Sequence, residues 1–204
     1  MEAMESRYRA NFINSVTGLK SASLIGTISE NGIDNLAVFS SITHLGSNPP
    51  LLGFVMRPVT VPRHTYKNIK DTGVFTVNHI HTDLIKQAHQ TAASYGEETS
   101  EFEKTGLTSE VLNHFKAPFV KEAHIKIGCE YVNEYRIAEN DTILVIGAIK
   151  EIHIPKNTLM EDGWIDLSKA NGVTINGLDG YAAGHLIDRY SYSKPEKDII
   201  SLLK

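Results

Sequence analysis

Residues 35–69 read NLAVFSSITHLGSNPPLLGFVMRPVTVPRHTYKNI, and this stretch indicates both a fold and a site. An apolar strand over residues 35–43 contains two adjacent serines and leads to a Pro-Pro turn. A second apolar strand over residues 51–57 precedes a short helix over residues 62–71. A helix N-terminus carries unpaired N–H groups and a partial positive charge. Hydroxyls, cations and a helix start this close together can therefore form a site for an anion such as phosphate.

The start of that helix holds the side chains that would bind the anion. Thr60 as the N-cap would place Pro62 in the first turn, where its missing N–H costs nothing. Arg57 and Arg63 could then give charge-assisted hydrogen bonds to a phosphate. The same arginines also fit a solvated surface, so the pattern alone leaves both interpretations open.

The strand before the turn has a similar pair of interpretations. It could be a core strand that simply ends in a polar loop, because structural and functional strands share one pattern. The small side chains of Ser40 and Ser41 favour a second interpretation. They would let a flat ligand approach the strand closely, where backbone N–H and C=O groups could read the polar edge of a heterocycle.

The composition is that of one globular domain. The chain has 204 residues, 41% hydrophobic and 22% charged, so a single domain over residues 1–204 can bury a sizeable core. A net charge of −4 argues against binding to nucleic acid, which needs a basic face. No apolar run is long enough to span a membrane, and the N-terminus lacks the apolar core of a secretory signal. Cys129 is the one cysteine, which excludes an internal disulfide and favours a cytoplasmic protein.

Hydrophobic patterning predicts many short strands and a few helices. Strands are expected over residues 21–29, 35–43, 51–57, 73–80, 123–136 and 142–154. Helices are expected over residues 5–15, 62–71 and 82–95, with a short one around 109–115 in a polar helical insertion near 94–118. The glycine-rich residues 171–184 show little periodicity. Because helices do not alternate regularly with strands, the pattern favours a mostly β (α+β) barrel over a parallel βαβ fold.

The other chemistry-bearing residues give weaker signals. The nine histidines show no ligand spacing such as HExxH, and no metal site is predicted. Cys129 lies in a strand-like run and is interpreted as buried and inert. The chain contains no GxGxxG after a strand, no phosphate-binding P-loop and no GxSxG.

Four motifs in order carry a resemblance to a known family. They are an N-x-A-x-x-S strand, an N-P-P-L turn, a T-x-x-N-I helix and an F-x-V-N strand, at Asn35–Ser40, Asn48–Leu51, Thr65–Ile69 and Phe75–Asn78. In this order the chain resembles the flavin reductase-like group of FMN-binding split barrels. The later segment GYAAGHLIDRYSYSKP is similar to the C-terminal part of that family. The sequence departs from many members at Asn48, where aspartate is common, and in the polar region 94–118, and both departures bear on the substrate.

The resemblance implies a split β-barrel of antiparallel strands with a few flanking helices, usually a homodimer with FMN near the dimer interface. It implies that the backbone around four residues contacts the isoalloxazine: Ala37, Val38, Phe39 and Ser40. It implies phosphate contacts from some of a second set: Ser41, Arg57, Arg63, His64 and Thr65. It also implies that Asn78 and His79 lie near the flavin.

The chemistry that the resemblance implies belongs to the flavin. NADH or NADPH would give a hydride to the flavin, and the electrons would pass to a small-molecule acceptor or, as free flavin, to a partner monooxygenase. We consider His185, which follows the glycine-rich segment, a candidate catalytic residue that could reach the nicotinamide or the acceptor. Two alternatives stay open: a flavin-binding protein or electron carrier without efficient reductase activity, and a related split barrel that holds haem or a pyridoxine phosphate.

Overall fold

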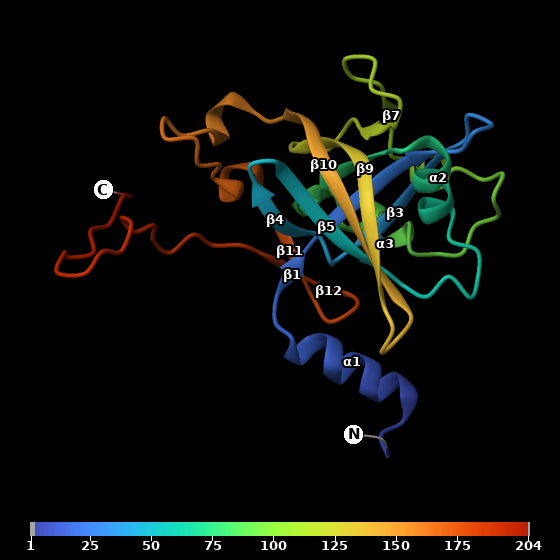
Figure 1. Ribbon diagram of the computed structural model, residues 1–204, viewed down its shortest axis with the longest axis horizontal. Coiled ribbons are helices and arrows are strands. Elements are labelled where there is room, and N and C mark those ends of the chain that lie inside the picture. The colour runs from blue at the N-terminus through green and yellow to red at the C-terminus, as the bar shows by residue number, and fades with distance from the viewer. Residues whose placement is uncertain (1–2, 204) are drawn as a thin grey trace.

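The computed structural model describes residues 3–203, and a large antiparallel sheet is its main feature (Figure 1). The strands of this sheet are β2 (Ser23–Ile28), β3 (Asp34–Phe39), β4 (Thr43–Ser47), β5 (Pro50–Met56), β6 (Val74–His79), β9 (Lys126–Ile137) and β10 (Thr142–His153). They follow one another across the sheet in the order β3-β2-β6-β9-β10-β5-β4. The mostly β, antiparallel fold class predicted from the sequence is therefore confirmed.

A side chain links the two ends of the sheet. Ser41 lies just after β3, the first strand in the sheet order, and Val55 lies on β5, the sixth. The Ser41 Oγ donates to the Val55 carbonyl oxygen at 3.2 Å and accepts from the Val55 N–H at 3.0 Å. The sheet thus curls until β3 approaches β5, and the two strands are bridged there by a hydroxyl instead of a full ladder. Within residues 3–203, no strand pairs with the outer edge of β3.

An apolar core fills the inside of the curled sheet. Phe54 on β5 is fully buried and packs edge-to-face against Phe39 and Phe75, with ring centroids 5.2 and 5.5 Å apart. Cys129 on β9 is buried in the same cluster, and burial raises the pKa of its thiol far above the ordinary value. Rings of this size supply much of the apolar area that stabilises a domain.

Helix α2 (His64–Thr72) packs against β2 and β3. Ile69 is its fully buried apolar residue, and the helix ends at Gly73, which has φ of +73°. Only a residue without a Cβ adopts that conformation without strain, so the glycine is a natural helix stop. The helix begins two residues later than the sequence predicted, and Arg63 is its N-cap.

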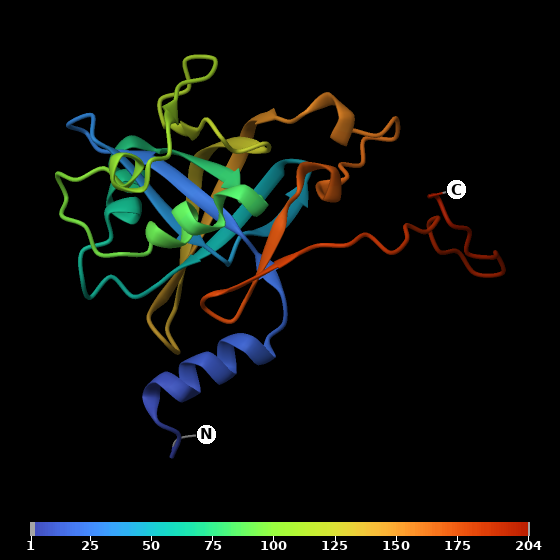
Figure 2. The same ribbon diagram turned by 180° about the vertical axis from the view of Figure 1, so that it is seen from behind.

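Two short helices cover the opposite face of β3. Helix α3 (Ile85–Gln90) and helix α4 (Glu101–Thr105) lie over the blue strands when the molecule is seen from behind (Figure 2). Leu84, Ala88 and Phe102 from this layer are buried against Leu24 and Leu36 of the sheet. Helix α3 is much shorter than the helix expected over residues 82–95, because a 3-10 turn precedes it and turns follow Gln90.

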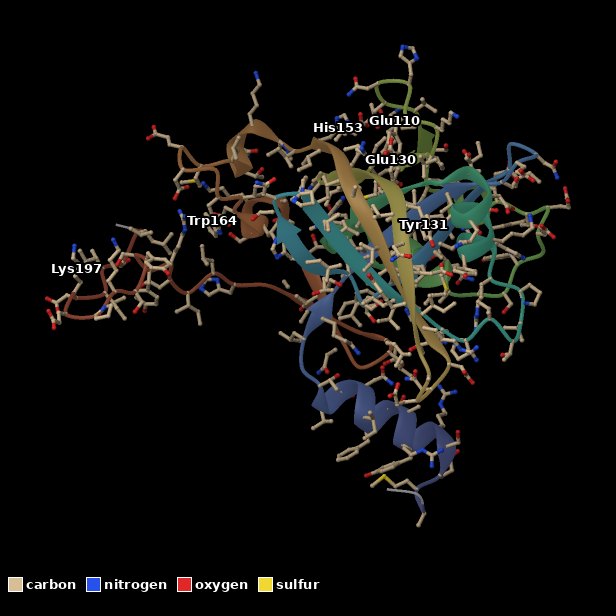
Figure 3. The ribbon with its side chains drawn as sticks, in the orientation of Figure 1. Glu110, Glu130, Tyr131, His153, Trp164 and Lys197 are labelled. Atoms are coloured by element: carbon tan, nitrogen blue, oxygen red, sulfur yellow. The ribbon has the colours of Figure 1, made fainter. Side chains whose placement is uncertain are left out.

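A small sheet and two projecting segments complete the structure. Strands β1 (Lys20–Ser21), β11 (Val173–Asn176) and β12 (Gly180–Ala183) form a three-stranded sheet beside the barrel. Helix α1 (Ser6–Val16) and the C-terminal tail extend away from it (Figure 1). The Arg189 guanidinium lies 4.7 Å from the Trp164 ring centroid and anchors the tail. The tail then runs outward and turns back near Lys197 (Figure 3), so that Ser201 pairs with Tyr190.

One expectation about the polar region 94–118 was wrong, and one segment without a prediction forms a hairpin. Residues around 109–115 form no helix, since the two-residue strands β7 (Ser109–Glu110) and β8 (Phe119–Val120) pair there instead. The segment 171–184 contains the β11–β12 hairpin, although its sequence showed little periodicity. Short strands carry too few residues to produce a readable alternation.

Candidate functional site

A cleft of about 850 Å³ lies along the open edge of β3. The residues after β5, the start of α2, the segment after α3 and the β11–β12 hairpin form its other walls. All predicted cofactor-binding residues except Asn78 and His79 line this cleft: Ala37, Val38, Phe39, Ser40, Ser41, Arg57, Arg63, His64 and Thr65. Residues from the stretch 35–69 thus line one cavity.

The edge of β3 presents backbone groups to the cleft. The Leu36 N–H points away from β2, because it donates to the Glu101 Oε2 at 2.9 Å. Backbone groups of successive residues alternate in direction along a strand. The N–H and C=O of Val38 therefore point to the same outer edge as the Leu36 N–H. A flat heterocycle laid against this edge could exchange hydrogen bonds with them.

Two of the predicted contact residues also have structural partners. The Ser41 hydroxyl makes two hydrogen bonds to the Val55 backbone, so this side chain holds the barrel closed while it also lines the cleft. The Phe39 ring packs on Phe54. At these two positions the closure of the barrel and the wall of the cleft depend on the same side chains.

Cations gather around the start of α2. Arg57 is exposed, and Arg63 and His64 are partly buried. The Arg63 side chain is held by a long hydrogen bond from its Nε to the Pro58 carbonyl oxygen at 3.4 Å. The expectation that Thr60 caps this helix was wrong, because the first helical residue is His64 and the N-cap is Arg63. Arginine offers no acceptor to the first-turn N–H groups, which leaves them able to bind an anion.

A buried polar network fixes the position of this helix start. The Asn35 Nδ2 on β3 donates to the Thr65 Oγ1 and to the Thr27 Oγ1, each at 3.1 Å. The Asn68 Nδ2 on α2 donates to the same Thr27 oxygen at 3.2 Å. The first turn of α2 is therefore tied to β2 and β3 by hydrogen bonds that water cannot easily replace.

Three predicted site residues do not line the cleft. Asn78 is fully buried, and its amide bonds the Leu24 carbonyl, the Thr76 hydroxyl and the Val120 N–H, which leaves it committed to the fold. His79 is partly buried on β6, and burial lowers its pKa. His185 lies exposed at the base of the C-terminal tail. The motif position alone could not show that β2 separates β6 from the open edge of β3.

Sequence reasoning missed one wall of the cleft. Ile175, Leu178 and Tyr181 come from the β11–β12 hairpin, and Asn14 comes from α1. The Tyr181 hydroxyl lies 3.3 Å from the His89 Nδ1 at the end of α3. A signal for this hairpin was present at Asn176-Gly177, a dipeptide typical of tight turns, and Gly177 has φ of +67°.

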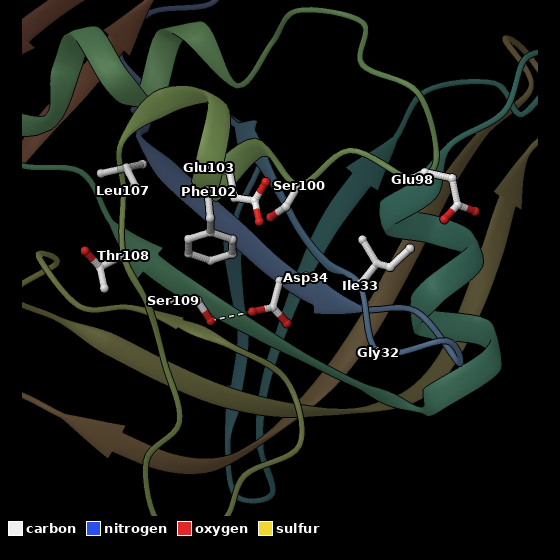
Figure 4. Close-up of a pocket in the computed structure, with 10 residues that line it drawn as sticks. All are labelled: Gly32, Ile33, Asp34, Glu98, Ser100, Phe102, Glu103, Leu107, Thr108 and Ser109. Carbon is white, nitrogen blue, oxygen red and sulfur yellow. Dashed lines mark hydrogen bonds between the residues drawn. The ribbon is translucent and has the colours of Figure 1, made fainter.

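A second, smaller hollow of about 490 Å³ lies beside the cleft (Figure 4). Asp34, Glu98 and Glu103 line it, together with Ser100, Phe102 and other residues of β3, α4 and the segments next to them. The Ser109 hydroxyl donates to the Asp34 carboxylate at 2.5 Å across this hollow. Its lining contains no lysine, arginine or histidine.

Residues 3–203 contain neither a cluster of metal ligands nor a membrane-spanning helix. No three His, Cys, Asp or Glu side chains gather there in a way that could hold a metal ion. None of the helices in this part of the chain combines the length and the apolar character needed to cross a membrane.

The curled sheet with an open strand edge defines a split barrel. Residues 20–166 match the flavin reductase like domain, and the chain belongs to that family. A crystal structure from Shewanella frigidimarina, described as a flavin reductase with a split barrel domain, is 47% identical, with a TM-score of 0.91 and coverage of 94% of this chain and 96% of that one. The family and the split-barrel fold predicted from the four motifs are thus confirmed.

Two further proteins are less similar to this chain or match a smaller part of it. The crystal structure of nitrilotriacetate monooxygenase component B from Bacillus cereus is 20% identical, with a TM-score of 0.82 and coverage of 92% of this chain and 96% of that one. An uncharacterised protein of Aquifex aeolicus is 35% identical over 108 residues, which are 52% of this chain and 55% of that protein.

Proposed function

We propose that this chain is an FMN-dependent oxidoreductase of the flavin reductase type. It takes hydride from NADH or NADPH onto the flavin and passes the electrons to an acceptor. The observation that carries the proposal is the cleft, in which an open strand edge, a cationic helix start and an apolar wall meet. Membership of the flavin reductase-like family supports flavin as the bound group.

The residues of the cleft fit FMN in size, shape and charge. A volume of about 850 Å³ is ample for a small molecule, since such sites measure roughly 300–1,000 Å³. The outward backbone groups of Val38 suit the polar edge of the ring. Arg57, Arg63 and the first turn of α2 suit the phosphate, which prefers cations and unpaired N–H groups.

The residues of the cleft indicate what the flavin and the protein chain would each contribute to the reaction. Bound flavin would supply hydride acceptance and electron delivery. The chain itself would orient the ring along β3, hold the phosphate beside α2 and exclude water with Ile175 and Leu178. No acid–base pair is needed for hydride transfer to a flavin, and the cleft has only one carboxylate in its lining, that of Glu101.

The acceptor we favour is a partner monooxygenase that receives reduced flavin. The support is the likeness of the fold to a protein named as a monooxygenase component. The open cleft, rimmed by the exposed residues Ala92 to Ser94, is consistent with a flavin that exchanges instead of staying permanently bound.

We further propose that the chain forms a homodimer. On α1, Tyr8 is 61% and Val16 67% exposed, and on the tail Ile187 is 88% and Tyr192 87% exposed. These apolar side chains lie on segments that project from the barrel (Figure 1), where a second copy could cover them. His185 lies at the base of the same tail, two residues after β12, and we propose that it contacts the nicotinamide or the acceptor.

Anaerobic reduction of the FMN-loaded protein tests the proposed function. We expect the visible flavin absorbance to bleach when NADH or NADPH is added, and to return when the acceptor is supplied. Bound flavin that stays oxidised would support the electron-carrier alternative. A protein that binds no FMN, or that purifies with the spectrum of haem, would contradict the proposal.

A further inference from the structure

Glu101 is a buried carboxylate in the wall of the cleft, and the flavin chemistry proposed above leaves it unused. It is the first residue of α4 and is only 5% exposed. Its neighbours Ser100, Phe102 and Glu103 line the acidic hollow instead, as Figure 4 shows. Glu101 is therefore the residue of α4 that faces the candidate flavin site.

The carboxylate of Glu101 holds the open edge of β3. Its Oε2 accepts from the Leu36 N–H at 2.9 Å. Leu36 is itself fully buried, so this N–H has no access to solvent that could replace the carboxylate. A buried donor without a partner is costly, and the strand edge would shift or loosen if the acceptor were removed. The next outward groups along the edge are those of Val38, which face the cleft.

The same carboxylate places a negative charge in a cavity that is otherwise cationic. His64 on α2 interacts with it electrostatically, whereas burial has the larger effect and raises the pKa of Glu101. The other titratable or charged groups of the cavity wall are Arg57, Arg63, His89, Tyr95 and Tyr181. A charge in a partly desolvated cavity acts strongly on an incoming anion, because the effective dielectric constant is low there.

We propose that Glu101 is a positioning residue that fixes the β3 edge for the flavin ring and weakens the binding of its phosphate. The first role depends on an acceptor oxygen, and the second depends on the negative charge. The first role stands on the hydrogen bond to Leu36, and the second rests on the proposed function. The phosphate penalty would keep FMN exchangeable, as delivery of reduced flavin to a partner requires.

Two substitutions at one position separate these roles. Glu101→Gln keeps an acceptor oxygen for the Leu36 N–H but removes the charge, and Glu101→Ala removes both. Glu103→Gln is the matched control, because it removes a charge from the same helix on the side of the acidic hollow. Each variant is titrated with FMN and with riboflavin, which has the same ring without the phosphate. Hydrogen exchange of the Leu36 amide is measured without flavin.

We expect Glu101→Gln to bind FMN several-fold more tightly, with riboflavin affinity and Leu36 exchange unchanged. Glu101→Ala should speed exchange at Leu36 and weaken riboflavin binding several-fold. An unchanged ratio of FMN to riboflavin affinity in Glu101→Gln would overturn the charge role, and slow exchange at Leu36 in Glu101→Ala would overturn the positioning role. Wild-type protein that binds neither flavin would refute the proposed function and the charge role with it, and Leu36 exchange would then decide the positioning role alone.

Discussion

The cleft and the acidic hollow share β3 and α4 as walls, yet they differ in charge. Arg57, Arg63 and His64 line the cleft, whereas Asp34 and Glu103 are among the residues that line the hollow. Both spaces are concave and both adjoin the same strand. Shape alone would therefore not select a phosphate-bearing ligand, because of these two spaces only the cleft combines cations with a helix N-terminus.

Reversing the charge at Arg63 should have the largest effect, because it removes a cation that distinguishes the cleft from the hollow. Arg63→Glu removes a charge-assisted hydrogen bond to phosphate, worth about 1.5–3 kcal/mol, and adds repulsion. We expect FMN affinity to fall at least about tenfold, with a much smaller change for riboflavin. Equilibrium titration by flavin fluorescence measures both ligands. The control is Glu103→Arg in the hollow, and equal losses for the two flavins would refute a phosphate site at α2.

Loosening the start of α2 should have the next largest effect. Thr65→Val keeps the volume of the side chain but removes the acceptor of the Asn35 Nδ2. One of the two N–H groups of the Asn35 amide then lacks a partner, while the other still donates to the Thr27 Oγ1. The unpaired buried N–H should lower the free energy of unfolding by about 1–3 kcal/mol. Urea unfolding followed by circular dichroism measures this loss. Unchanged stability would show that the network around Asn35 does not fix the helix to the sheet.

The free energy of unfolding should depend on pH through Glu101, the carboxylate in the wall of the cleft. Burial raises the pKa of this carboxyl in the folded protein above its ordinary value of 4.5. The folded state then holds the proton more tightly than the unfolded chain. Its contribution to stability is complete below the ordinary value and is lost as the pH rises through the raised pKa. In urea unfolding at a series of pH values, the stability of wild type relative to Glu101→Gln should decline across this window. A constant difference would contradict the expected shift.

The smallest effect is expected in the hollow. Ser109→Ala removes the hydrogen bond to Asp34 between two side chains near the surface. Stability should change by no more than about 0.5 kcal/mol, and the affinities for FMN and riboflavin should stay the same. A clear change in FMN affinity would mean that the cleft and the hollow are coupled through β3 and do not act independently.

The fold and most of one cleft wall were readable from local sequence. A strand, a turn at the prolines, a second strand and a helix occur over residues 35–69 in the predicted order, because each has its own periodicity and stop signals. The expected single strand over residues 35–43 was wrong, since β3 ends at Phe39 and the separate strand β4 (Thr43–Ser47) lies at the opposite end of the sheet. Contacts between residues far apart in the sequence could not be read in this way. Asn78 matches a family motif, but it is fully buried and bonds backbone groups from β2 and β8. The role of His185, which lies exposed at the base of the tail, stays a prediction.

The resemblance of four motifs to a known family identified the chain as a split-barrel flavin reductase-like protein, and local pattern indicated many short strands and cations beside a short helix. Hydrophobic spacing and turn residues act between near neighbours, so they can be read along the chain. The folded structure was needed to show that Glu101, from a polar region with no clear pattern, bonds the edge of β3, and that the β11–β12 hairpin forms the far wall of the cleft. These contacts join residues far apart in the sequence, and they depend on how the sheet curls, which no local pattern specifies.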